Sequence, residues 1–76
     1  MQSDHTTAPT TRDIRLDLIS VTEWRVCDRR FPEQDSRSIL GFIERRGFRY
    51  EVTSVREPGS VTSYGSLASA TSSFSD

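Results

Sequence analysis

Apolar and polar side chains alternate one by one in two neighbouring segments near the start of the chain, and this alternation limits the fold more than any other feature. In Arg12–Ile19 every second residue from 14 to 18 is Ile or Leu, and in Glu23–Asp28 Trp24 and Val26 alternate with polar residues. A period of two is typical of a β-strand that is buried on one face. The polar residues between the segments predict a turn, so the two strands form a hairpin.

Two further strands are predicted at Ser38–Arg45 and Phe48–Val55, on either side of a turn at Gly47. We expect a three-residue loop in which Gly47 adopts the left-handed conformation and forms a bulge. The pairs that define this register are Glu44 with Phe48 and Phe42 with Tyr50. On one face it gathers five apolar residues for burial, namely Leu40, Phe42, Phe48, Tyr50 and Val52. Ile43 then lies on the opposite, outer face.

The C-terminal part predicts a short edge strand at Val61–Tyr64 and a helix with Ser66 as its N-cap, with apolar residues at helical spacing as far as Phe74. Gly41 within a strand indicates a bulge or close packing by this helix. The predicted fold class is therefore α+β: a small antiparallel β-meander of three to five strands packed by one C-terminal helix in two layers.

The chain has 76 residues, which is enough for one domain, and its apolar residues lie mainly between residues 14 and 55. We expect residues 1–12 to be a disordered N-terminal tail and residues 13–76 to form the single domain, with its last few residues frayed. The N-terminus has neither the basic start nor the apolar stretch of a signal peptide, and no apolar run is long enough for a membrane span. These features predict a cytoplasmic protein that does not bind membranes.

Few residues in this chain are suited to catalysis or metal binding. His5 is the single histidine and Cys27 the single cysteine, so one chain cannot supply a four-ligand zinc site. Cys27 has Arg25 and Arg29 nearby, which would favour a thiolate, but no histidine base accompanies it. The four glycines do not have the spacing of a phosphate-binding loop. We therefore expect no catalytic residue, no metal and no cofactor.

Arginine supplies all ten basic residues, although the formal net charge is −1. Arg45, Arg46 and Arg49 surround the tip of the second hairpin beside two aromatic residues, and Arg25 is expected on the outer face. Arginine binds phosphate and stacks on bases, so these four residues are candidate contacts to nucleic acid or to a protein partner. The alternative is a solvated surface on which the arginines pair with neighbouring glutamates, and the net negative charge favours this alternative.

The chain contains several short motifs, namely a W-x-V-x-D pattern at Trp24–Asp28, Phe31–Glu33, an L-G-F-I-E pattern at Leu40–Glu44, Tyr50–Val52 and Ser66–Ala70. Together these motifs resemble those of a group of small actinobacterial proteins of unknown function. The resemblance covers about residues 14–74 and implies no activity, cofactor or partner. The helix departs from the pattern because it is rich in Ser where acidic helix formers are expected.

These observations predict a non-enzymatic binding or accessory domain. The first hypothesis is protein–protein association, with an unknown protein or with a second copy, through a sheet edge or through an exposed strip around Ile43. The alternative is nucleic-acid binding by the arginine-rich hairpin.

Overall fold

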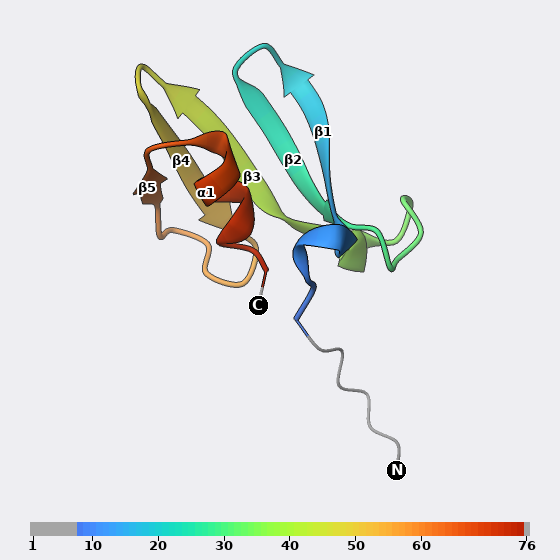
Figure 1. Cartoon of the computed structure of the whole chain (residues 1–76). Coiled ribbons are helices and arrows are strands. Elements are labelled where there is room, and N and C mark those ends of the chain that lie inside the picture. Colours follow the sequence, from blue (N-terminus) through green and yellow to red (C-terminus); the bar gives the residue numbers. More distant parts are fainter. Residues whose placement is uncertain (1–7, 76) are drawn as a thin grey trace.

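The computed structural model describes residues 8–75, which form a five-stranded antiparallel sheet and one α-helix (Figure 1). The strands follow one another across the sheet in the order β1-β2-β3-β4-β5. Their bounds are β1 Ile14–Ser20, β2 Glu23–Asp28, β3 Ile39–Arg46, β4 Arg49–Ser54 and β5 Thr62–Tyr64. The helix α1 spans Leu67–Ser72, and two 3₁₀ turns, η1 and η2, span Thr11–Asp13 and Ser36–Ser38. The predicted α+β meander with a C-terminal helix is confirmed.

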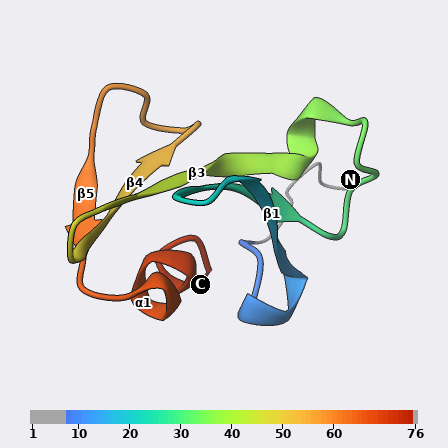
Figure 2. The same ribbon diagram turned by 90° about the horizontal axis from the view of Figure 1, so that it is seen from above.

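The sheet curves around α1, which packs on its concave face and forms the second layer (Figure 2). Val26, Ile43 and Ala70 are fully buried between the layers, and Ile14 and Val52 complete the core. We call this the helix-side face and the opposite one the outer face. Because directly paired residues of antiparallel strands share a face, the register assigns every strand residue to one of the two.

Close packing at Gly41 confirms the prediction made for this residue. A Cβ atom there would lie 2.6 Å from Cε1 of Phe74, just beyond α1, and would also collide with the Thr53 carbonyl oxygen. Only a glycine allows Phe74 to lie this close to β3. The β2–β3 register also shifts here, because Val26 pairs with Gly41 and the next residue, Cys27, pairs with Ile39. Leu40 of β3 is therefore the extra residue of a bulge next to Gly41.

The predicted register of the second hairpin is wrong. Arg46 pairs with Arg49, and the loop has two residues, of which the first, Gly47, has φ 61°. A two-residue hairpin loop with glycine in its first position matches the twist of the strands. Compared with the predicted three-residue loop, it changes the partner of every residue in the hairpin. As a result Ile43 lies on the helix-side face with 0% exposure, while Phe48 is 94% exposed. Phe42 is exposed on the outer face.

Helix α1 begins where the sequence predicts, since the Ser66 hydroxyl oxygen accepts a hydrogen bond from the backbone N–H of Ser69 at 3.0 Å. The helix itself is short and ends at Ser72. Its hydroxyl groups bond back to the chain, as when Thr71 Oγ1 donates to the Leu67 carbonyl at 2.7 Å. Such bonds compete with helix propagation, which accounts for the small second layer.

Part of the N-terminal segment predicted to be disordered belongs to the described fold. Pro9 is buried, and the Thr10 backbone N–H donates to the Asp13 carboxylate at 2.9 Å around η1. Residues 1–7 lie outside the described residues.

Candidate interaction surface

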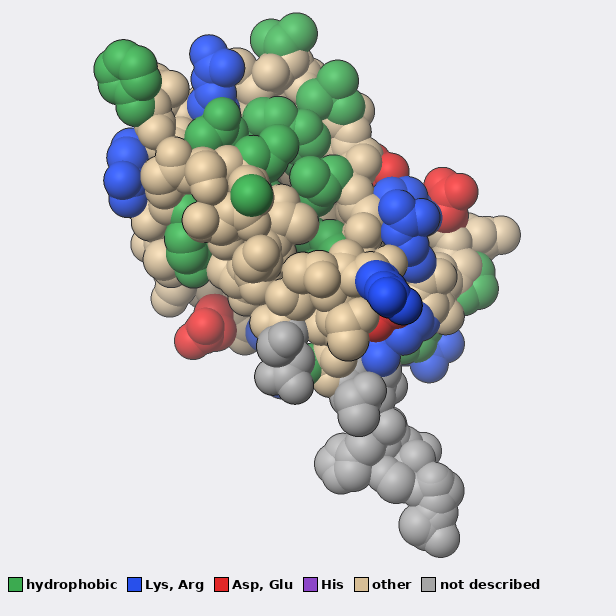
Figure 3. Space-filling model, viewed as in Figure 1, with side chains coloured by type: hydrophobic (Ala, Val, Ile, Leu, Met, Phe, Trp, Pro, Cys, Tyr) green, Lys and Arg blue, Asp and Glu red, His purple; other side chains and the backbone are tan. Residues whose placement is uncertain are grey.

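Helix α1 covers only part of the helix-side face, and apolar side chains lie open beside it. Leu18 is 65% exposed and lies directly opposite Trp24, whose ring is 6.1 Å from that of Tyr50. We call Leu18, Trp24 and Tyr50 the apolar patch. Figure 3 shows hydrophobic side chains gathered on the upper part of this face, towards the hairpin ends. An uncovered group of this kind on a small domain is typical of an interaction site.

Among the residues that the structure describes, β1 pairs with β2 alone, and its free edge adjoins this patch. The Arg29 backbone N–H donates to the Asp13 carbonyl at 2.6 Å, which continues the β1–β2 ladder. In an antiparallel pair the direction of the backbone groups alternates. The N–H and C=O groups of Leu16 and Leu18 therefore point away from the sheet, at its open edge.

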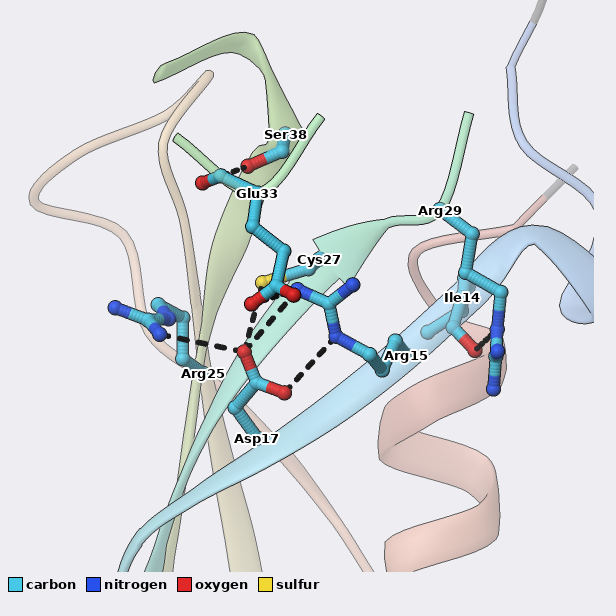
Figure 4. Close-up of polar contacts among 8 residues, drawn as sticks. All are labelled: Ile14, Arg15, Asp17, Arg25, Cys27, Arg29, Glu33 and Ser38. Atoms are coloured by element: carbon cyan, nitrogen blue, oxygen red, sulfur yellow. Dashed lines mark hydrogen bonds and ion pairs between the residues drawn. The ribbon is translucent and has the colours of Figure 1, made fainter. Parts of the chain in front are cut away.

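The beginning of this edge is partly occupied. The Ile14 N–H donates to the Thr11 carbonyl, and the Ile14 carbonyl accepts a hydrogen bond from Arg29 Nε at 3.3 Å (Figure 4). Within the described residues, no segment other than β2 forms a ladder with β1. The unpaired stretch is therefore centred on Leu16 and Leu18.

A group of charged side chains lies on the outer face of β1. Asp17 accepts from Arg15 Nε at 2.9 Å and from Arg25 Nη2 at 3.3 Å (Figure 4). The hydrogen bond from Arg15 is the main reason why the pKa of Asp17 falls from 3.8 to about 2. Oε1 of Glu33 lies 3.9 Å from Nη2 of Arg15, so Arg15 is near two carboxylates. This group contains both signs of charge.

Cys27 lies next to these charges but is only 2% exposed. Its Sγ atom is 3.6 Å from Oδ2 of Asp17. Burial, followed by the nearby Asp17 charge, raises the pKa of the thiol. A nucleophilic cysteine needs the opposite shift together with access to substrate, so this environment suits a structural role.

The four candidate arginines do not converge on one surface. Arg45 lies on the helix-side face opposite Tyr50, whereas Arg25, Arg46 and Arg49 lie on the outer face. Arg46 pairs with Glu44 at 3.2 Å and with Glu51 at 2.9 Å. The hairpin tip thus does not present one cationic surface.

The remaining outer-face arginines are also engaged. Arg25 pairs with Asp17, and Arg49 donates to the Ser63 hydroxyl at 2.8 Å and to the Ser63 carbonyl at 3.1 Å. Glutamates lie in register across three strands beside them, at Glu23, Glu44 and Glu51. A row of carboxylates repels phosphate, which opposes phosphate binding on this part of the outer face.

A hollow with a volume of about 520 Å³ lies at the opposite end of the sheet, beside Phe74 and Arg56. Its described lining contains no Cys or His, and its one carboxylate belongs to Glu57. Across residues 8–75 no three His, Cys, Asp or Glu side chains are grouped as metal ligands. No helix in this part of the chain is long and apolar enough to cross a membrane.

The sequence predicts a contact at a sheet edge but does not predict which strand forms that edge. The sequence pattern that could have pointed to β1 is in the segment Asp13–Ile19, where Leu16 lies between the opposite charges of Arg15 and Asp17. The strip around Ile43, the second contact predicted, is buried and is excluded.

The chain matches no protein-family model, no curated protein and no solved structure.

Proposed function

We propose that this protein is a non-enzymatic association domain that forms a homodimer through the free edge of β1 and the adjoining apolar patch. The observation that carries the proposal is the combination, on one strand, of unpaired backbone groups with a side chain, Leu18, that is 65% exposed. An open edge strand is a template for pairing with another chain, and pairing would also cover Leu18.

The size of the domain supports this proposal. A chain of 76 residues buries a smaller share of its surface than a larger domain, and its second layer here is a helix of six residues. Association adds apolar burial that the single chain lacks, and it stabilises the folded state by mass action.

Self-association is tested by the molecular mass as a function of concentration. Sedimentation equilibrium from about 1 μM to about 1 mM covers dissociation constants from tight to weak. We expect the mass to rise from 8.6 kDa towards twice that value. A mass that stays at one chain over the whole range would refute the proposal.

Nucleic-acid binding is the weaker candidate. It rests on Arg45, which has an exposed position beside Tyr50, whereas Arg25, Arg46 and Arg49 are paired within the chain. This alternative is tested by repeating the sedimentation experiment with random-sequence duplex DNA added at low salt. A salt-sensitive complex would favour this alternative.

A further inference from the structure

We infer that two copies pair antiparallel along β1 with their two-fold axis at Leu16, so that Arg15 of each chain faces the partner's Asp17. This inference rests on the proposed function and specifies its geometry.

The direction of the backbone groups limits the register. Within the regular ladder of residues 14–18, Ile14, Leu16 and Leu18 direct their N–H and C=O groups outward, so even-numbered residues must face even-numbered residues of the partner. A symmetric dimer has the same patch on both chains, which restricts the axis to a position at one residue of β1. The three central positions are Arg15, Leu16 and Asp17.

The charges of Arg15 and Asp17 favour one of these three positions for the axis. An axis at Arg15 would place two arginines directly opposite each other, and an axis at Asp17 would do the same with two aspartates. Like charges directly opposite destabilise a strand pair, whereas opposite charges stabilise it. An axis at Leu16 places Arg15 against the partner's Asp17 at two symmetric positions, next to charges that already pair at 2.9 Å within each chain.

The same axis gives the outward N–H groups of Leu16 and Leu18 acceptors and extends the apolar surface. The two Leu16 residues exchange their backbone hydrogen bonds, and the Leu18 N–H donates to the partner's Ile14 carbonyl. That carbonyl keeps a lone pair for this bond beside its contact with Arg29. On the helix-side face Leu16 lies against the partner's Leu16, and Leu18 lies against the partner's Ile14. The two sheets then form one continuous sheet.

The test uses two single variants that complement each other, Arg15→Asp and Asp17→Arg. Each variant alone would place like charges opposite each other across the axis, and we expect its dimer dissociation constant to rise at least about tenfold. In an equimolar mixture, the introduced aspartate of one variant faces the introduced arginine of the other, and the native Asp17 faces the native Arg15. We expect the mixed dimer to regain an affinity within about threefold of the wild type. Circular dichroism verifies that each variant is folded.

A disulfide provides a second readout that does not depend on charge. Leu16→Cys brings two thiols across the axis at a Cα separation of about 5.5 Å, which suits a disulfide. Leu18→Cys is the matched control, since it is more exposed but lies more than about 13 Å from the partner's Leu18. Mild oxidation should link the first variant into a covalent dimer and leave the second as single chains.

The outcomes separate this inference from the proposed function. A wild-type protein that remains one chain refutes both. A wild-type dimer whose affinity is unchanged by either charge variant, or in which Leu18→Cys crosslinks instead of Leu16→Cys, refutes the axis at Leu16 and leaves self-association intact. Restoration in the mixture together with crosslinking at Leu16 supports the axis.

Discussion

The two edges of the sheet differ in how much free backbone they expose and in how they are protected. β1 has seven residues and carries exposed Leu18, whereas β5 has three and is held by the Arg49 guanidinium, which bonds the Ser63 hydroxyl and carbonyl. Natural sheets often protect an edge with a short strand and with long charged side chains. β5 is short and is covered by the Arg49 side chain, whereas a charged side chain bonds the outward backbone of β1 only at Ile14. Within the described residues the sheet therefore has one protected edge, β5, and one open edge, β1.

The largest expected difference concerns the anchors of the two edges. Asp28, opposite Ile14, is 2% exposed and accepts hydrogen bonds from the Arg30 side chain at 2.8 Å and its backbone N–H at 3.0 Å. Asp28→Ala should lower the free energy of unfolding by about 2–3 kcal/mol, since bonds to a charged group are lost in a buried place. Ser63→Ala at the β5 edge should cost less than about 1 kcal/mol. Urea unfolding measures both, and equal losses would show that the edges are anchored alike.

The next difference concerns association. Leu18 and Val61 are matched probes, at 65% and 62% exposure, beside opposite edges. Leu18→Asp should raise the dimer dissociation constant about 10- to 100-fold, because covering a leucine contributes about 1.5–3 kcal/mol. Val61→Asp should leave it unchanged. A larger effect of Val61→Asp in sedimentation would move the interface to β5.

Acid should affect the β1 side of the sheet first. The pKa of Asp17 is about 2 in the folded chain against an ordinary value of 3.8, so the unfolded chain takes up the proton first as the pH falls. The stabilisation is complete above about pH 4 and is lost between about pH 4 and pH 2. Asp17→Asn should therefore reduce the slope of stability against pH in this window. An unchanged slope would mean that other carboxylates account for the acid sensitivity, such as Asp28, whose pKa is also lowered by Arg30.

The smallest expected effect is on the thiol next to the open edge. Cys27 should react with iodoacetamide at least about tenfold more slowly in the folded chain than in urea, because it must wait for local opening. A cysteine placed at Leu18 should react rapidly in the dilute protein. Fast reaction of Cys27 itself would contradict its buried position.

The strands were predictable because their alternation is local, and Glu23–Asp28 has the predicted bounds. The register of the second hairpin was not predictable in this way. The prediction counted the apolar residues on each face and assumed that Phe42 and Phe48 would be buried. The structure exposes both aromatics and buries Ile43, which fits under α1 beside Gly41. That choice depends on how the helix packs, which no single strand reveals.

For the candidate site, the sequence led to a sheet edge in general and not to a particular strand. A sheet edge was named as a contact, but the choice of β1 over β5 depends on the length of each strand and on the Arg49–Ser63 bonds. The arginine cluster looked continuous in the sequence because Arg45 and Arg46 are neighbours. Neighbours in a strand point to opposite faces, and the register then placed Arg46 between Glu44 and Glu51.

The most direct test of pairing through β1 is amide hydrogen exchange at two protein concentrations, one well below and one well above the dissociation constant. We expect the amides of Leu16 and Leu18 to exchange rapidly in the dilute sample and slowly in the concentrated one, while the amides of β5 keep the same rates. A dimer that forms without protecting Leu16 and Leu18, or that protects β5 instead, would contradict the account.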